Sequence, residues 1–244
     1  MESTIIVSIN VHENLSFLEK QIENIKNHLL IPHKVILNCS IAFHKELEER
    51  KAFVKNENVI LNPVPLDKKR YHGSLLKGIY SNLEWSRKNY GFDYFLVLSS
   101  RTFFYRNFGV LDLQQLPKRE SYKTLKNIEK SNKRKRFSSF LQTKLARHIK
   151  KNGPERFVAG AHEGVLFDSK NCDTICDFLE SRKVIRDELF KWKWCVEEFA
   201  LQTICSFKNG YYYSIGTGLQ TYKIDNVPDD TKHMHTYVCK IERK

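Results

Sequence analysis

The chain has 244 residues, of which 41% are hydrophobic and 12% aromatic, and it carries a formal net charge of +13. This length and apolar content suit one α/β domain built round a single core. No apolar run reaches the roughly 18 residues that a membrane-spanning helix needs, which excludes such a helix. The first residues lack the features of a signal peptide. We therefore expect a cytoplasmic protein, with peripheral attachment to a membrane left as an alternative.

The cysteines and histidines do not form a recognisable metal-binding pattern. Six cysteines are scattered along the chain without a Cys-x-x-Cys pair, which argues against a zinc site or a small disulfide scaffold. A reducing compartment fits this pattern best. His233 and His235 alternate on a possible strand, but no third ligand accompanies them, so zinc is disfavoured.

Much of the positive charge lies between residues 118 and 152, including the run Lys133-Arg134-Lys135-Arg136. Clustered Lys and Arg can form a phosphate-binding surface. A solvated segment is the plainer interpretation. We expect a mobile basic insertion with some helix around 118–152, and not a second domain. An anionic membrane surface is the alternative partner for it, and no specific nucleic acid is expected.

Apolar segments in the first part of the chain alternate between strand-like and helix-like patterns. The run from Ile5 to Val11 is typical of a buried strand, and Asn14 is placed to cap a helix. Further strands are predicted at 34–38, 58–61 and 92–98, and helices at 42–54 and 75–88. This alternation predicts an α/β fold with a mostly parallel central sheet flanked by helices. Ligands bind beyond the carboxyl ends of such strands, which is where Ser99, Ser100 and Arg101 would lie.

The pattern after the basic insertion is less regular. A strand-like stretch at 157–167 is interrupted by Gly160 and Gly164. We expect helices at 171–181 and 194–207, and short strands at 211–215, 219–224 and 237–241. The whole chain, residues 1–244, is expected to form one domain.

Glu197 and Glu198 are two adjacent acids in an otherwise apolar and aromatic segment. Burial there would raise the pKa of a carboxyl group toward working pH, as a general base requires. Adjacent residues of a helix diverge by about 100°, so we expect only one of the two to face a cleft. A pair of surface acids beside a core stripe remains an equally good interpretation.

A phosphate group held without a metal ion needs Lys, Arg or exposed backbone N–H groups to balance its charge. The sequence has no Asp-x-Asp triplet, a short signature of metal-dependent nucleotide binding. We therefore expect no metal site, and basic residues near the end of the chain in its place. The candidates are Lys223, Lys232, Lys240 and Arg243, although each alone is more typical of a charged surface.

Two further segments could bring polar groups to a ligand. His72 and Ser74 precede a predicted helix, whose N-terminus favours an anion or a polar ligand. A simple cap by Ser74 explains that pattern equally well. His162 and Glu163 lie between two glycines that allow close approach of the backbone, although a bulged strand is the plainer account. Gly-x-x-x-x-Gly-Lys and Gly-x-Gly-x-x-Gly motifs are absent, which disfavours kinase-like and dinucleotide-binding interpretations.

Several separated segments, taken in order, resemble the core-2/I-branching N-acetylglucosaminyltransferase and peptide xylosyltransferase family, including its plant relatives. The opening strand leads to His12, and His72-Gly73-Ser74 is similar to a family segment that precedes a helix. Residues 92–104 resemble the family's Phe-x-x-Leu-Ser strand and the turn after it. The segment from Glu197 to Thr203 resembles its Asp-Glu-x-x-x-x-Thr signature, with Glu197 in place of the Asp.

This resemblance implies a GT-A-like fold and an inverting glycosyltransferase. The donor would be a nucleotide diphosphate sugar, and the acceptor a hydroxyl group of a glycan or glycoprotein. The resemblance implies no divalent cation and no other cofactor. Glu198 aligns with the family's catalytic base, with Glu197 as the alternate. The base would take the acceptor proton as the acceptor oxygen attacks the anomeric carbon.

The predicted site residues fall into two groups under this hypothesis. Those assigned to the donor are His12, His72, Ser74, Ser99, Ser100, Arg101, Lys223, Lys232, Lys240 and Arg243. Those assigned to the acceptor are His162, Glu163 and Trp194, the last by stacking on a sugar ring.

Two other functions remain open from the sequence. A non-catalytic binder of polyanions or nucleic acid would use the basic insertion, and its binding would weaken strongly with salt. A nucleotidyl- or phosphate-transferring α/β enzyme would require magnesium. The sequence offers no convincing set of cation ligands for the second function.

Overall fold

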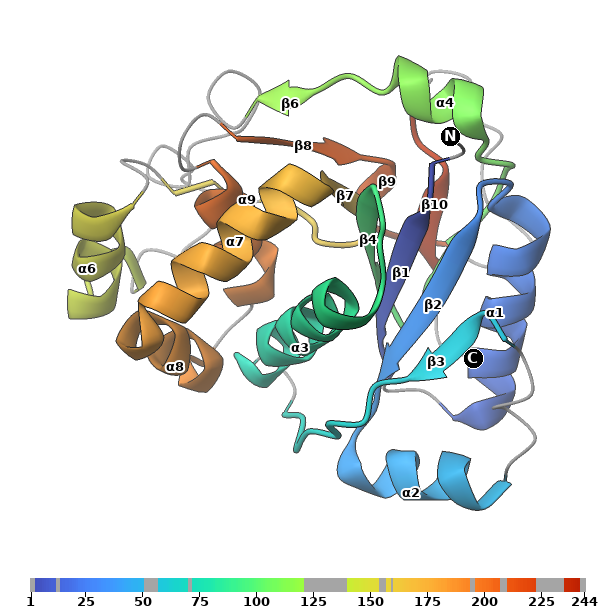
Figure 1. Ribbon diagram of the computed structural model, residues 1–244, viewed down its shortest axis with the longest axis horizontal. Helices are drawn as coiled ribbons and strands as arrows, with labels where there is room; N and C mark the ends of the chain where they lie inside the picture. The colour runs from blue at the N-terminus through green and yellow to red at the C-terminus, as the bar shows by residue number, and fades with distance from the viewer. Residues whose placement is uncertain are drawn as a thin grey trace.

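A computed structural model gives the arrangement of the chain. It describes residues 3–11, 14–50, 57–69, 72–120, 140–153, 157–158, 160–193, 196–206, 210–222 and 235–241. Within these ranges the protein is an α/β structure in which helices pack on both faces of a central sheet (Figure 1).

Among the described residues, the central sheet has seven strands in the order β3-β2-β1-β4-β7-β8-β6. Strand β1 is parallel to both β2 and β4, and β2 is parallel to β3. Strand β7 is antiparallel to β4, β8 to β7, and β6 to β8. The strands are β1 (Ile5–Asn10), β2 (His33–Asn38), β3 (Val59–Leu61), β4 (Tyr94–Ser99), β6 (Arg119–Glu120), β7 (Val165–Asp168) and β8 (Tyr211–Ser214).

A second, smaller sheet has the order β5-β10-β9. Its strands are β5 (Thr102–Phe104), β9 (Gly216–Tyr222) and β10 (Val238–Ile241). Strand β10 is antiparallel to β5 and parallel to β9. Strand β5 begins soon after β4 ends, so Ser100 and Arg101 carry the chain from one sheet to the other.

Helices cover the two faces of the central sheet in separate groups (Figure 1). The first group is α3 (Ser74–Asn89), α6 (Lys144–Asn152), α7 (Ser169–Ser181), α8 (Lys183–Lys191) and α9 (Ala200–Cys205). The second group is α1 (Leu15–His28), α2 (Ile41–Arg50) and α4 (Val110–Gln115). A short 3-10 helix, η3 (Val196–Glu198), precedes α9.

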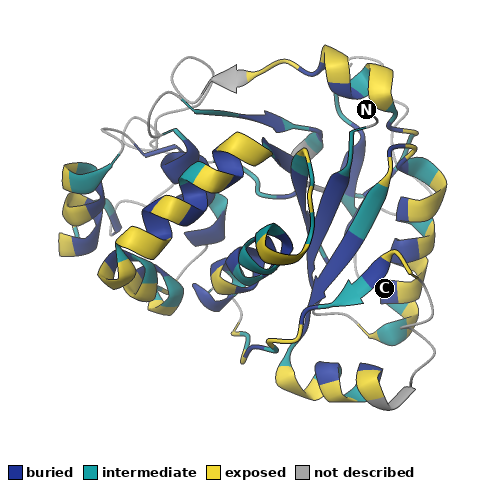
Figure 2. Ribbon diagram, viewed as in Figure 1, coloured by how far each residue is buried: buried dark blue, intermediate teal, exposed yellow. Residues whose placement is uncertain are grey.

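The core consists of two large apolar clusters, one on each face of the sheet. Strand β1 contributes to both, because its successive side chains point to opposite faces. Ile6 packs in the cluster with α3, whereas Ile5, Val7 and Ile9 pack in the cluster with α1. All six residues of β1 are buried, as Figure 2 shows for the centre of the sheet. Burial on both faces explains why the strand reads as an almost continuous apolar run.

The sequence-based expectation of an α/β fold with a mostly parallel central sheet flanked by helices is confirmed. Asn14 caps α1 as predicted, its side chain accepting a hydrogen bond from the backbone N–H of Phe17. Within the described ranges, no helix is both long and apolar enough to span a membrane.

Only the two ends of the insertion expected at 118–152 lie within the described residues, and the helix expected there is α6. Arg119–Glu120 pairs with β8 as strand β6. At the other end, Phe140, Leu145 and Ile149 are buried in the core, the last two on one face of α6. The basic residues between them hid this apolar stripe in the sequence. The run from Lys133 to Arg136 lies outside the described residues.

Two other predicted elements begin later than expected. The helix predicted at 194–207 starts only at Ala200, since Phe199 has non-helical backbone angles and η3 precedes it. In the strand-like stretch at 157–167, strand β7 begins only at Val165, immediately after Gly164. Gly164 has a positive φ of 79°, which breaks the extended conformation there.

Candidate functional site

The parallel strands end together at one edge of the sheet. Asn38 of β2, Asn10 of β1 and Ser99 of β4 are aligned in register, and we call this line the carboxyl edge. The chain passes from β1 to β2 and β3 on one side, and then crosses back to β4 on the other side of β1. In open α/β sheets, this reversal of strand order between β1 and β4 is the place where ligands bind.

The turn between β4 and β5 is held firmly at the carboxyl edge. The Ser99 and Thr102 hydroxyl groups are 2.9 Å apart and hydrogen-bonded. The Arg101 carbonyl oxygen accepts from Ile241 N of β10 at 2.8 Å, and Arg101 Nη1 donates to the Ile241 carbonyl oxygen at 3.4 Å. Gln21 of α1, which sequence reasoning missed, donates through Nε2 to the carbonyl oxygens of Ser99 and Thr102 at 2.8 Å each. The hydroxyl of Ser99 is therefore already engaged by the turn, and Ser100 is buried.

Beside the end of β4, the structure brings together two residues predicted for different substrates. Lys240 Nζ donates to Glu163 Oε1 at 2.5 Å, and His162 Nδ1 lies 3.6 Å from Glu163 Oε2. Glu163 is 3% exposed. Burial by itself would raise the pKa of Glu163, but the charges of His162 and Lys240 outweigh it and hold that pKa below its ordinary value. Glu163 is thus an ionised carboxylate that ties the first residues before β7 to β10.

Two glycines place the backbone of Glu163 against β9. A Cβ atom on Gly164 would lie 2.6 Å from the backbone nitrogen of Gly216, and one on Gly216 would lie 2.3 Å from the Glu163 carbonyl oxygen. Both distances are shorter than any normal contact. The sequence pointed to Gly164 through its unusual place in a strand-like run, whereas nothing marked Gly216 before the two segments were seen together.

We expect Gly164→Ala to lower the free energy of unfolding by about 2 kcal/mol, because it combines a left-handed backbone with a clash. Gly91→Ala is the matched control, since a Cβ atom at Gly91 meets nothing within 4 Å. Urea unfolding of the two variants measures the difference. Equal stability of both variants would contradict the close approach of β7 and β9.

Glu197 is the acid of the predicted pair that joins this group. It is 4% exposed, whereas Glu198 is of intermediate exposure. Burial raises the pKa of Glu197; the charge of His162 opposes this shift, while Glu198 and Glu163 add to it. Glu197 Oε2 has no hydrogen-bond partner among the described residues. We call His162, Glu163, Glu197 and Lys240 the acid cluster.

Glu198 plays a visible backbone role next to the acid cluster. Its carbonyl oxygen accepts a hydrogen bond from Gly160 N at 3.0 Å, which fixes η3 to the segment before His162. Within η3, Glu197 is buried and Glu198 is partly exposed.

Backbone N–H groups at the start of α3 already have hydrogen-bond partners within the protein. His72 Nδ1 accepts from Ser74 N at 3.1 Å, and the Ser74 hydroxyl accepts from Lys69 N at 2.9 Å. Gly73 N donates to the Trp192 carbonyl oxygen at 2.7 Å. These contacts occupy N–H groups that an anion would need. The simple cap by Ser74 is not observed: Ser74 is the first residue of α3, Gly73 is its N-cap without a side-chain cap hydrogen bond, and it is the His72 ring that accepts from the Ser74 N–H.

Lys68 is a basic side chain at the carboxyl edge that sequence reasoning missed. Its Nζ donates to the carbonyl oxygen of Asn38, at the end of β2. Burial lowers the pKa of Lys68 to about 7. Burial also raises the pKa of the nearby Cys39 thiol to about 12, so Cys39 is not a thiolate. The only available signal was the position of Lys68 after a proline-containing loop that follows β3.

Five predicted site residues cannot be placed beside the acid cluster. His12, Trp194, Lys223, Lys232 and Arg243 lie outside the described residues. In the part of the chain that the structure describes, no three His, Cys, Asp or Glu side chains are grouped as metal ligands would be. The cysteines described there, Cys39, Cys172, Cys176, Cys205 and Cys239, are free and buried.

Neither a protein-family model nor a curated protein is similar to this chain.

Proposed function

We propose that this protein is a glycosyltransferase with a GT-A-like fold. It would transfer a sugar from a nucleotide diphosphate sugar to a glycan or glycoprotein hydroxyl group, with inversion at the anomeric carbon. The observation that carries the proposal is the acid cluster at the carboxyl edge, where a buried Glu197 lies near His162 and the Glu163–Lys240 pair.

The strand order supports the nucleotide part of this proposal. The order β3-β2-β1-β4 is that of one half of doubly wound nucleotide-binding sheets, in which the ligand lies at the reversal point. The second sheet adds β10 and Lys240 to this edge. A mostly parallel sheet with a small sheet beside its carboxyl edge is compatible with a GT-A-like arrangement.

The geometry favours Glu197 over Glu198 as the general base. A base works best when its pKa lies near the operating pH, and burial shifts the pKa of Glu197 in that direction. Its free Oε2 is available to accept a proton from an acceptor hydroxyl group. The pKa values of the two carboxyl groups are shifted in opposite directions, that of Glu163 below and that of Glu197 above the ordinary value, a pattern typical of acid–base sites.

Cationic side chains at the same edge suit a leaving diphosphate. Lys240 supplies an ammonium group near the end of β4, and Lys68, whose pKa burial lowers to about 7, supplies an amine near the end of β2 that is cationic when protonated. Charge-assisted hydrogen bonds from such groups stabilise developing negative charge in a site shielded from water. We propose that they perform this task without a divalent cation.

Turnover of a panel of nucleotide diphosphate sugars, with and without EDTA, tests the proposal. We expect one donor to be hydrolysed or transferred at a rate that EDTA does not change. Loss of turnover with EDTA would contradict the metal-independent mechanism. Failure of every donor to bind would reject the transferase and favour a polyanion-binding protein, for which the exposed basic face of α6 provides a surface.

A further inference from the structure

A groove of about 620 Å³ lies between α6 and α8, outside the acid cluster. Its walls come from α6 with the residue before it, from α8, and from the two residues after α8. Its lining residues are Thr143, Lys144, Leu145, Glu188, Lys191, Trp192 and Lys193. Trp192 is partly exposed and offers part of an aromatic surface to the groove.

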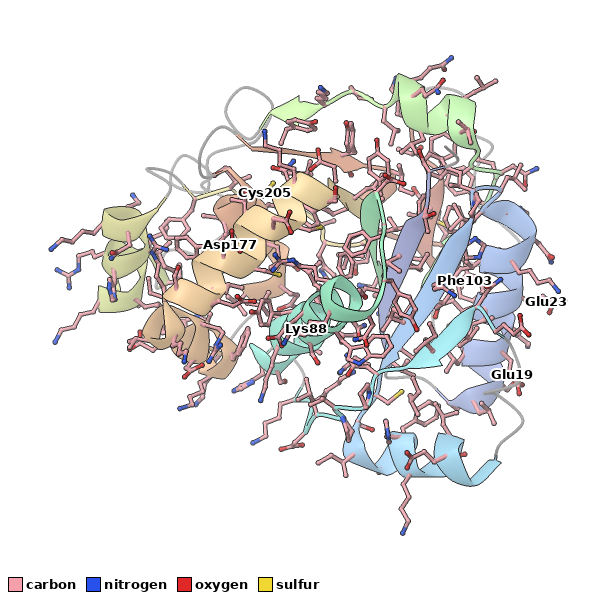
Figure 3. All side chains as sticks on the ribbon, in the orientation of Figure 1. Glu19, Glu23, Lys88, Phe103, Asp177 and Cys205 are labelled. Atoms are coloured by element: carbon pink, nitrogen blue, oxygen red, sulfur yellow. The ribbon has the colours of Figure 1, made fainter. Side chains whose placement is uncertain are left out.

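The groove is strongly positive. Lys144, Lys191 and Lys193 are exposed, against one acid, Glu188. Among the described residues, no ion pair involves any of these three lysines. The neighbouring face of α6 adds further cations, and its side chains point into solvent with nitrogen at their ends (Figure 3).

The groove is coupled to the segment that carries Glu197. Phe140 packs against both Trp192 and Phe199, with ring centroids 5.3 and 4.7 Å apart, and Phe199 follows directly after η3. Only four residue steps separate Lys193 from Glu197. A fully extended chain of that length spans at most about 14 Å between Cα atoms. One end of the groove is therefore close to the proposed base.

We propose that this groove binds an acidic oligosaccharide and that the acceptor of the transfer reaction belongs to this class. The inference rests on the proposed function. The lysines would pair with carboxylate or phosphate groups, and Trp192 would pack on a sugar ring. This arrangement leads the acceptor from the groove toward Glu197. A neutral glycan would leave the three ammonium groups without partners.

Isothermal titration calorimetry with hexagalacturonate as the probe tests this inference. Maltohexaose, a neutral hexamer, is the comparison ligand. We expect hexagalacturonate to bind at least about tenfold more tightly, and its binding to weaken with added salt. The measurement needs no turnover, so it separates this inference from the proposed function: a protein inactive with every donor can still bind the probe.

Charge reversal in the groove provides the matched test. Lys191→Glu combined with Lys193→Glu should weaken hexagalacturonate binding by at least about tenfold. Lys170→Glu combined with Lys183→Glu makes the same change in net charge at exposed positions outside the groove, and should change binding by less than about twofold. Circular dichroism melting of both double variants checks that each is folded.

Three outcomes would overturn the inference. Equal loss of binding in both double variants would indicate attraction by net charge alone. Equal affinity for hexagalacturonate and maltohexaose would show that the groove does not select acidic oligosaccharides. Binding of the wild-type protein to phosphatidylserine-containing vesicles, lost in the groove variant and without hexagalacturonate binding, would identify the groove as a membrane contact.

Discussion

Glu197→Gln should lower kcat by about 10²- to 10⁴-fold, the usual contribution of a general base, while donor affinity stays nearly unchanged. The amide keeps the shape of the side chain but cannot accept the acceptor proton. Steady-state kinetics with the donor identified in the panel measures kcat, and calorimetry measures donor affinity. Glu198→Gln is the matched control, because Glu198 is of intermediate exposure and is engaged through its backbone carbonyl.

The pH dependence distinguishes a base from a structural residue. Burial raises the pKa of Glu197, and only the ionised carboxylate can take a proton. The wild-type rate should therefore fall as pH drops through that raised pKa, and the residual rate of Glu197→Gln should lack this acid limb. A large loss in Glu198→Gln with a small one in Glu197→Gln would return the assignment to Glu198, as the family resemblance implied.

Lys240→Met should lower the free energy of unfolding at pH 7 by about 3 kcal/mol, because it leaves the buried Glu163 carboxylate without its main partner. In the wild type the pKa of Glu163 is below its ordinary value. The ionised carboxylate therefore adds stability above its unfolded pKa, and this is lost as pH falls through the folded pKa. Without Lys240 the folded pKa rises, so the gap between variant and wild type should narrow from pH 7 toward pH 5. Urea unfolding at both pH values measures it.

A second substitution separates the charge from the shape of the pair. Lys240→Met combined with Glu163→Gln removes both charges and should be more stable than Lys240→Met alone. If the double variant is no more stable than Lys240→Met, the ion pair is not the source of the loss. Glu163→Gln alone is the remaining variant of this double-mutant cycle.

The part of the fold that could be predicted from sequence is the part with the simplest burial pattern. Strands β1 and β4 lie inside a sheet covered on both faces, so their sequences are nearly uninterrupted apolar runs. The Asn14 cap and the spacing of the apolar residues predicted helix α1. Both signals are local, and each can be read without knowledge of the rest of the chain.

The remainder was hidden by contacts between distant segments. Helix α6 carries its apolar stripe among so many cations that its average composition resembled a surface segment. The sequence predicted Glu163 and Lys240 as separate ligand contacts. Their ion pair could not be predicted, because it joins residues that are 77 positions apart. Gln21 left no signal, since its role depends on a turn formed by a different part of the chain. The choice between Glu197 and Glu198 depends on which side chain is buried, and the sequence of two adjacent acids does not indicate this.

The joining of β5 to β10 has a consequence for how the protein folds. Arg101 contacts Ile241 across 140 positions of sequence, among the most distant pairings described in the chain. Pairings with such high contact order carry a large loop-closure cost and slow the folding of the structures that depend on them. The parallel half of the sheet can assemble from segments much closer in sequence. Pairing of β1 to β4 alone does not bring Lys240 to the carboxyl edge, so the acid cluster is completed only when β10 pairs with β5.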